Sequence, residues 1–447
     1  MSYKKLAIFI LLAVFIAPIN SINAQEKFGP TPNAQQLAWH EKEFYLFMHF
    51  GPNTFTDLEW GKGSEDPNVF NPTQLDCNQW ARIAKAAGAK GIIITAKHHD
   101  GFCLWPSKFS THTVRESKWM NGKGDVIKML SEACKKAGIE MGVYISPWDR
   151  NHPKYGTPAY NDIYIQTMKE LLTGYGKFFE LWWDGANGEG PNGKKQVYDF
   201  KRFQDSALRY QPQVLIFSDI GPHIRWIGNE QGIINETNWN TLDTVGFKRG
   251  AGGPPTDSLN RGNINGKAWI PGEADVSIRK GWFYHEEEDK TVKTDKQLFD
   301  LYLKNVGRGG NFLLNVPPNR KGLISPVDSA ALINFKKLRD AAFKTNVFKN
   351  ATFKNNKNQI EICLPTAATF NTLQLQEQIK YGQRVISFEI EAGENESTLK
   401  KIASSTTIGR KKIIQFPTVT AKCIKVKITA AKASPVMGAV AGFLIKE

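Results

Sequence analysis

Apolar residues gather in short runs between about residue 36 and residue 343, and helical patterns separate many of these runs. The runs are rich in β-branched and aromatic residues and are apolar almost without interruption, which is typical of parallel strands covered on both faces. Eight runs predict strands: LFMHFG (46–51), GIIITAKHHDG (91–101), EMGVYIS (140–146), FFELWWDG (178–185), VLIFSDIG (214–221), GIINETNW (232–239), AWIPGEADVS (268–277) and NFLLNVPP (311–318).

The segments between these runs carry signals for helix starts and stops. Residues 72–88 start at Pro72 and stop at Gly88, and residues 125–138 have an aspartate at the start and lysines before a final glycine. Eight strands that alternate with helices over about 300 residues predict a (β/α)8-like TIM barrel, to which we assign residues 25–343. The stretches after residues 221 and 239 are less regular, so we expect some helices there to be short or missing.

After about residue 345 the apolar residues recur at every second position. Segments such as QIEICLPTA (359–367) and KIIQFPTVTAKCIKVKITA (412–430) show this alternation, and no long helical pattern lies between them. The pattern predicts a C-terminal antiparallel β-sandwich over residues 344–447. This region contains no tryptophan, which favours a structural module over a sugar-stacking one. If the chain forms a disulfide, Cys363 and Cys423 are the most plausible pair, because both lie in this region.

The first residues, MSYKKLAIFILLAVFIAPINSINAQ, have the layout of a secretory signal peptide. Two lysines precede an apolar stretch, Leu6 to Ile16, that is too short to span a bilayer comfortably. We expect cleavage after Ala24, so that residues 1–24 are removed. No cysteine follows the apolar stretch and no later stretch has the length of a transmembrane helix. The prediction is therefore a periplasmic or secreted protein without a membrane anchor.

Composition and charge exclude some functions. The chain carries a net charge of +15, but its basic residues are scattered and form no nucleic-acid-binding motif. We therefore expect no nucleic-acid partner. The five cysteines are widely spaced and form no CxxC metal motif. The sequence predicts no particular oligomeric state.

The active site of a TIM barrel lies at the carboxyl ends of its strands, and several polar residues fall there. A single histidine or an Asp-Gly turn at such a place is commonly structural. Here several polar residues are predicted to share one rim, which favours a functional site. They are His49, His98, His99, Asp184, Ser218, Asp219, Glu230, Glu236 and Glu273.

Histidines beside carboxylates could bind zinc, but the spacing argues against a metal. Because side chains alternate along a strand, the adjacent His98 and His99 would point to opposite sides. A sugar fits this set better, since indoles stack on sugar rings and glycosidic cleavage uses two carboxyl groups. Asp184, at the end of the fourth run, is a natural nucleophile. Of the neighbouring Trp182 and Trp183, one should pack outside the barrel.

Seven motifs in the same order resemble glycoside hydrolase family 29, the α-L-fucosidases. They are MHFG (48–51), LEW (58–60), KHHDGF (97–102), YIS (144–146), ELWWDG (180–185), GWFYH (281–285) and GNFLLNVPP (310–318). The resemblance covers about residues 28–343. It implies a retaining, exo-acting hydrolase of terminal L-fucose on glycans, built on a (β/α)8-like barrel followed by a β-sandwich. No cofactor is required.

The resemblance also implies roles for individual residues. Asp184 matches the nucleophile, and the fucose pocket would use His49, Glu59, Trp60, His98, His99 and Trp282. The segments RWIGNEQG (225–232) and WIPGEADVSIRKGWFYH (269–285) look like the subgroup that acts on branched α-1,3/4-fucosides. In that subgroup the acid/base resembles Glu230. Glu273 is the second choice, and Glu236 and Glu189 follow.

Other functions remain open on the same scaffold. One alternative is an α-L-fucosidase of broad, α-1,2 or α-1,6 specificity, and another is an α-L-galactosidase, because pockets reject one extra hydroxyl only modestly. Further alternatives are a non-catalytic fucose-binding protein and a metal-dependent barrel hydrolase.

Overall fold

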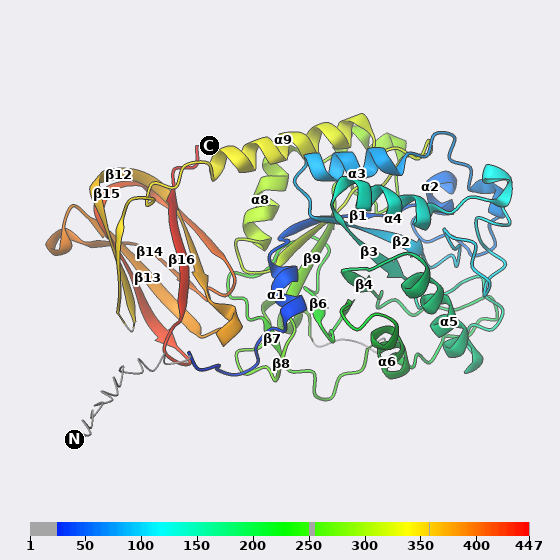
Figure 1. Cartoon of the computed structure of the whole chain (residues 1–447), viewed down its shortest axis with the longest axis horizontal. Coiled ribbons are helices and arrows are strands. Elements are labelled where there is room, and N and C mark those ends of the chain that lie inside the picture. The colour runs from blue at the N-terminus through cyan, green and yellow to red at the C-terminus, as the bar shows by residue number, and fades with distance from the viewer. Residues whose placement is uncertain (1–24, 250–254, 357, 447) are drawn as a thin grey trace, which may run out of the picture.

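Eight parallel strands close into a barrel, in the order β1-β10-β9-β6-β5-β4-β3-β2 (Figure 1). The computed structural model describes residues 25–249, 255–356 and 358–446. The predicted (β/α)8-like fold is confirmed. The barrel strands are β1 (Phe44–Met48), β2 (Gly91–Lys97), β3 (Glu140–Ile145), β4 (Glu180–Trp182), β5 (Leu215–Ser218), β6 (Ile224–Trp226), β9 (Gly272–Ser277) and β10 (Asn311–Asn315).

Helices cover the outside of the barrel, and capping side chains set several of their starts. Helix α3 begins after Asp76, whose carboxylate accepts the amide of Gln79 at 2.9 Å, so the helix starts later than Pro72 suggested. The helices are α1 (Ala34–His40), α2 (Pro52–Thr56), α3 (Cys77–Ala86), α4 (Val126–Ala137), α5 (Ala159–Gly174), α6 (Phe200–Tyr210), α7 (Thr256–Arg261), α8 (Asp295–Asn305) and α9 (Pro326–Ala342). Short 3-10 turns are η1 (Pro67–Val69), η2 (Trp119–Gly122), η3 (Glu286–Thr291), η4 (Ile379–Tyr381) and η5 (Glu396–Thr398).

The predicted sixth strand, residues 232–239, is wrong. The sixth strand in the chain is β6, which follows β5 after only five residues. Its middle residue is the charged Arg225, so the segment does not form an apolar run and was not predicted as a strand. The fully buried guanidinium donates to the carbonyls of Leu259, Ile270 and Trp239 and to the side chain of Asn238. The apolar Ile234 instead packs against Ile227 and Ala274.

The predicted seventh strand, residues 268–277, divides at Pro271. Its first part, β8 (Ala268–Trp269), leaves the barrel and pairs antiparallel with β7 (Thr241–Leu242). Its second part is the barrel strand β9. Proline has no amide hydrogen and therefore interrupts the hydrogen-bond ladder of a strand.

The C-terminal region is antiparallel, as predicted, and its strands form one bent sheet. The long strands β12 and β15 pair along most of their length, with a register shift between Cys363 and Ala368. Residues on both sides of that shift, such as Ile362 and Leu373, belong to the same apolar core. The sandwich is therefore one folded sheet. Its strands are β11 (Thr352–Asn356), β12 (Gln359–Glu377), β13 (Val385–Gly393), β14 (Lys400–Thr406), β15 (Lys412–Ala431) and β16 (Met437–Phe443).

Cys363 and Cys423 lie directly opposite each other on β12 and β15. Their sulfur atoms are 3.9 Å apart, and both thiols are free in this structure.

The C-terminal sheet contacts the barrel near the amino ends of the barrel strands. Arg410 forms an ion pair with Glu41, and Lys411 with Glu43, both just before β1. Arg308, just before β10, forms an isolated antiparallel backbone β-bridge with Lys412. In Figure 1 the sheet lies to one side of the barrel, and α9 runs from the barrel toward it. The sheet is thus at the end of the barrel opposite to the carboxyl ends of the strands.

The predicted signal peptide, residues 1–24, lies outside the described residues. In the part of the chain that the structure describes, no helix is both long and apolar enough to cross a membrane.

Candidate active site

Asp184 lies at the carboxyl end of β4, where the sequence predicted it. Its Oδ2 accepts a hydrogen bond from the hydroxyl of Tyr144 at 2.9 Å, and its Oδ1 accepts the amide of Ala186 at 2.7 Å. The next residue is glycine, and a Cβ at Gly185 would lie 2.2 Å from a carboxylate oxygen of Asp219, so a larger residue would displace that side chain. The side chain of Asp184 remains 23% exposed. The carboxylate is therefore held in place and still open to a substrate.

Asp184 and Glu230 line one pocket of about 480 Å³. Asp184 comes from the end of β4, whereas Glu230 comes from the loop after β6 and is exposed. The pocket therefore brings together the two carboxyl groups that the sequence proposed as a catalytic pair. Aromatic and acidic side chains complete its wall: Trp182, Phe217, Asp219, Trp226 and Asp275.

The surroundings of Glu230 favour its protonated form. Loss of water on its protein-facing side raises its pKa, and the nearby carboxylates of Asp184 and Glu59 act in the same direction. The indole N–H of Trp282 donates to Oε2 of Glu230 at 3.3 Å and lowers the pKa. The net direction is upward, so Glu230 has the character of a proton donor beside Asp184.

His98 and His99 both reach the site, which corrects the expectation that they would point to opposite sides. Strand β2 ends at Lys97 and the chain then turns, so the two imidazole rings lie 4.1 Å apart. Nε2 of His99 lies 3.7 Å from Asp184, and its Nδ1 contacts the hydroxyl of Ser146 at 2.8 Å. Among the described residues, no three His, Cys, Asp or Glu side chains are grouped as metal ligands would be.

The imidazoles of the site are neutral hydrogen-bonding groups. Burial lowers the pKa of His99 to about 4 and that of His49 to about 3. Nδ1 of His49 contacts the amide oxygen of Asn315 at 2.9 Å, and that amide is oriented by donating to Ser277 and to the carbonyl of Trp282. Since an amide oxygen only accepts, Nδ1 of His49 carries the hydrogen. Its Nε2 can therefore accept a hydrogen bond from a sugar hydroxyl.

Glu59 positions Trp282 through the backbone. Its carboxylate accepts the amides of Trp282 at 2.8 Å and Phe283 at 3.2 Å, and it also pairs with His285 at 2.7 Å. The indole of Trp282 lies 5.1 Å from the ring of His49. The neighbouring Trp60 is 56% exposed and packs edge-on against His99. These contacts place an aromatic group on two sides of the histidines.

The two tryptophans of β4 face opposite sides, as predicted. Trp182 points into the barrel and stacks on Phe217 with ring centroids 4.0 Å apart. Trp183 is fully buried against Phe200 and Phe203 of α6.

Glu273, the second choice for the acid, lies beneath Trp182. It is fully buried, and its Oε1 accepts the indole N–H of Trp182 at 2.9 Å. Tyr45 donates to its other oxygen. Burial raises the pKa of Glu273 to about 7, and burial beside Glu273 also raises the pKa of Glu180. Glu273 is therefore part of the barrel interior, separated from the pocket by an indole.

The two remaining candidates lie elsewhere. Glu236 accepts a hydrogen bond from Ser405 at 2.6 Å, on the side of the C-terminal sheet. Glu189 contributes its backbone carbonyl to the indole of Trp148 at 3.0 Å, in the loop after β4.

Sequence reasoning assigned no role to three residues of the site, of which Asp275 and Trp226 line the pocket and Tyr144 donates to Asp184. Tyr144 and Asp275 lie on strands β3 and β9, and Trp226 ends β6. The position of Asp275 could have been predicted from the sequence. Residues two apart on a strand face the same side, so the carboxyl groups of Glu273 and Asp275 point the same way. Burial and the nearby carboxylates of Glu230 and Glu273 raise the pKa of Asp275. Tyr144 belongs to the YIS motif (144–146), but neither the motif nor its place near the end of a strand indicated a contact with Asp184.

Comparison with known proteins identifies the family. The model of the family described as alpha-L-fucosidase matches residues 4–337. Alpha-L-fucosidase 1 of Arabidopsis thaliana is 40% identical over 442 residues, covering 91% of this chain and 86% of the relative. A glycoside hydrolase family 29 member from an unknown rumen bacterium is 41% identical with a TM-score of 0.89, covering 94% of this chain and 78% of that one.

A family 29 fucosidase of Ruminococcus gnavus, solved in complex with fucose, is 28% identical with a TM-score of 0.84, covering 95% of this chain and 97% of that one. The relatives match the barrel and the C-terminal sheet together, since they cover nearly the whole chain. The chain therefore belongs to glycoside hydrolase family 29 and is an α-L-fucosidase.

Proposed function

We propose that this α-L-fucosidase is a retaining, exo-acting hydrolase that removes terminal α-1,3- and α-1,4-linked L-fucose from branched glycans. The observation that carries the mechanism is that Asp184 and Glu230 line one pocket from different elements. Asp184 is the nucleophile and Glu230 the acid/base. The mechanism needs two carboxyl groups with different protonation states, and the different surroundings of these residues favour that difference.

In the first step Asp184 attacks the anomeric carbon of fucose. The hydroxyl of Tyr144 and the amide of Ala186 hold the attacking carboxylate and stabilise its charge before attack. Glu230 gives its proton to the glycosidic oxygen as that bond breaks. The products of this step are the shortened glycan and a covalent fucosyl ester of Asp184.

In the second step Glu230, now ionised, takes a proton from a water molecule. That water attacks the anomeric carbon and releases Asp184. Two inversions give net retention. His49, His98 and His99 are neutral in this site and are suited to hydrogen-bond the hydroxyls of fucose, while Trp60 and Trp282 cover its apolar parts.

The linkage preference is supported by the segments 225–232 and 269–285. The first places Glu230 after β6, and the second places Trp282 where its indole N–H meets Glu230. Both resemble the subgroup that acts on branched α-1,3/4-fucosides. The two segments thus meet at the proton donor, where the leaving sugar must also lie.

Fucose release from three substrates tests the proposal. The mature enzyme is given a branched Lewis-type trisaccharide, a linear α-1,2-fucoside and an aryl fucoside, with Asp184→Ala beside it on all three. We expect efficient cleavage of the branched substrate only, and no cleavage by the variant. Equal cleavage of the linear fucoside would refute the linkage preference. Faster cleavage of an aryl α-L-galactoside than of the aryl fucoside would favour the galactosidase alternative.

We further propose that the enzyme is exported to the periplasm or beyond. The lysines and the short apolar stretch of residues 1–24 support this, as does the small residue at the expected cleavage site. N-terminal sequencing of the enzyme from intact cells tests it. We expect Gln25 as the first residue, and a mature protein that still begins with residue 1 would refute export.

A further inference from the structure

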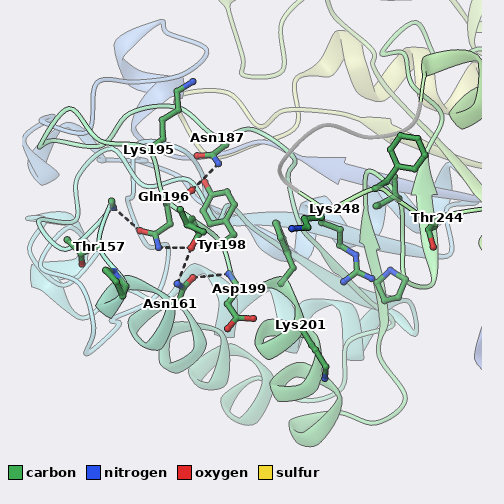
Figure 2. A pocket seen from close by; sticks show the side chains of 18 of the residues that line it. Thr157, Asn161, Asn187, Lys195, Gln196, Tyr198, Asp199, Lys201, Thr244 and Lys248 are labelled. Atoms are coloured by element: carbon green, nitrogen blue, oxygen red, sulfur yellow. Dashed lines mark hydrogen bonds between the residues drawn. The ribbon is translucent and has the colours of Figure 1, made fainter.

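A second and larger cavity, of about 990 Å³, adjoins the pocket of Asp184 and Glu230 (Figure 2). It lies between the first turns of α5 and α6 and the segment 244–249. Ligand sites commonly enclose about 300–1,000 Å³, so the cavity is large enough for part of an oligosaccharide. None of the residues proposed to act on fucose lines it.

The two cavities share a wall formed by two short chain segments. In one segment Ala186 lines the active pocket and the next residue, Asn187, lines the second cavity. In the other segment Asp219 lines the active pocket and Ile220 lines the second cavity. The hydroxyl of Tyr198, a residue of the second cavity, contacts the carbonyl of Ala186 at 3.4 Å. The amide of the same Ala186 donates to Asp184. A substrate whose fucose lies at Asp184 can therefore place its remaining sugars in the neighbouring cavity.

The charge of the second cavity is mainly positive. Four cationic residues line it, namely Lys195, Lys201, Lys248 and Arg249. The acidic residue of its wall, Asp199, caps α6 by accepting the amide of Arg202 at 3.1 Å. Lys201 is neutralised by Asp205. A ligand in this cavity therefore meets positive charge that the wall itself does not balance.

Two of the cations are suited to meet a ligand. Figure 2 shows the Lys248 side chain extending toward Tyr198, whereas the amines of Lys195 and Lys201 point outward. Arg249 donates to the neutral side chain of Gln204 at 2.9 Å, and its buried Nε has no partner among the described residues. Among all the residues that the structure describes, no carboxylate lies within ion-pair distance of Lys248 or Arg249.

Apolar side chains complete the wall of the cavity. Phe247 is 39% exposed and Val197 is 84% exposed, although both are apolar. The buried Ile220 and Ile270 also line the cavity. Apolar surface beside hydrogen-bonding groups suits a sugar ring, and the unbalanced cations suit an acidic group on that sugar.

We propose that this cavity binds an anionic substituent, a carboxylate or a sulfate ester, on the glycan from which fucose is removed, with Lys248 and Arg249 as its cationic ligands. The proposal rests on the proposed cleavage of branched glycans at Asp184. The net charge acts in the same direction: it is +15 for the whole chain and +13 once residues 1–24 with their two lysines are removed, and it attracts acidic glycans over a longer range.

Matched glycans test the proposal. The substrates are a neutral branched Lewis-type trisaccharide, the same glycan with a terminal sialic acid, and the same glycan with a sulfate ester on galactose. We expect kcat/KM to be about five- to tenfold higher for at least one acidic glycan, which is less than one buried charged hydrogen bond contributes, because the site is partly exposed. The preference should fall in 0.5 M salt, where exposed charges are screened over about 4 Å.

Two variants identify the cations. The double variant Lys248→Gln/Arg249→Gln should lose the acidic preference and keep its activity on the neutral trisaccharide and the aryl fucoside. Lys195→Gln is the matched control, because it removes a cation of the same wall whose amine points outward. Normal activity on the aryl fucoside shows that each variant is folded.

The outcomes separate this proposal from the proposed function. Acidic glycans cleaved no faster than the neutral one, or a preference that survives in the double variant, would overturn the cationic site. If only the sialylated glycan is preferred, the group is a carboxylate, and if only the sulfated one, a sulfate ester. If the enzyme releases no fucose from any glycan, the proposed function fails. Binding of the same three glycans to Asp184→Asn, measured by calorimetry, then still tests the cavity.

Discussion

The two halves of the barrel differ in regularity, and each supplies one carboxyl group of the active pocket. From β1 to β5, a helix follows each strand before the next strand begins. From β5 onward the pattern changes: β6 follows β5 after five residues, and residues 227–271 separate β6 from β9. In the described part of that stretch α7 is the only α-helix, beside the short strands β7 and β8. Asp184 comes from the regular half and Glu230 from the irregular half.

This division matches the different demands of the two residues. A nucleophile must stay in one place relative to the anomeric carbon, and Asp184 is fixed by a strand end, Tyr144 and an amide. A proton donor must follow the leaving group, which differs from glycan to glycan. Glu230 is on an exposed loop, and among the described residues its carboxylate accepts a hydrogen bond from one side chain, that of Trp282. The difference indicates that the regular half holds the proposed nucleophile in place, whereas the irregular half carries the residue that must adapt to the leaving glycan.

Replacing Asp184, the proposed nucleophile, should have the largest effect and tests the role that we assign to the regular half. We expect Asp184→Gly to lower kcat by about three to five orders of magnitude on every fucoside, because a covalent step is lost. Azide should partly restore turnover of an aryl fucoside by entering the vacated space. The product should be the β-fucosyl azide, since one inversion replaces two. An α-azide would show that Asp184 is not the nucleophile.

Removing the proton donor should give a smaller loss that depends on the leaving group. We expect Glu230→Gln to lower kcat/KM by about two to four orders of magnitude on an oligosaccharide, the usual size of general acid catalysis. On an aryl fucoside with an acidic phenol the loss should be about tenfold, because that phenol leaves without a proton. The matched control is Glu273→Gln, which should keep most of its activity. A larger loss of kcat/KM on the oligosaccharide in Glu273→Gln than in Glu230→Gln would make Glu273 the acid and overturn our assignment.

The regularity of the two halves also explains what could be predicted from the sequence. The strands of the first half are apolar, and their ends at His49, His98 and Asp184 could be located from the pattern alone. In the second half, Arg225 lies in a barrel strand and is satisfied by carbonyls from distant segments. Because those partners are brought together only by folding, no local pattern could reveal the strand. The resemblance located Glu230 because it compares motifs rather than periodicity.

The histidine pair shows a second limit. Alternation along a strand would separate His98 from His99, but β2 ends at Lys97, before both histidines, and the chain then turns. The predicted run continued to residue 101, and side-chain alternation does not apply beyond the end of a strand. Strand ends are the least certain part of a sequence prediction, and they are also where a TIM barrel carries its chemistry.

The buried carboxyl groups under Trp182 should affect stability more than activity. Burial raises the pKa of Glu273 to about 7, above the value of about 4.3 that is usual for glutamate. The folded chain therefore holds a proton that the unfolded chain releases above about pH 4.3, and stability should fall as the pH rises from there toward 7. Glu273→Gln cannot ionise, so it should reduce this fall by about 1 kcal/mol or more.

Thermal unfolding of the wild type and of Glu273→Gln at a series of pH values measures this effect. The two curves should converge near pH 4 and separate toward pH 7, with the variant losing less stability. Glu389→Gln on the C-terminal sheet is a control of opposite sign, because the hydrogen bond from Lys401 lowers the pKa of Glu389, and this variant should not lessen the loss of stability toward pH 7. Parallel curves for the wild type and the Glu273 variant between pH 4 and pH 7 would show that folding does not raise the pKa of Glu273.

The smallest expected effect concerns the contact between Trp282 and Glu230, which joins the two segments of the irregular half. The indole N–H stabilises the ionised carboxylate and lowers its pKa, so Trp282→Phe should raise the pKa of Glu230. Activity that needs protonated Glu230 is lost as the pH rises through this pKa. The basic limb of kcat/KM should therefore move upward by about 0.3–0.5 pH unit, the size of a weak, exposed hydrogen bond. In Trp60→Phe, which keeps the N–H of Trp282, the limb should stay in place. A downward shift in Trp282→Phe, or equal shifts in both variants, would mean that another group controls the basic limb, because only Trp282 donates to Glu230 among the described residues.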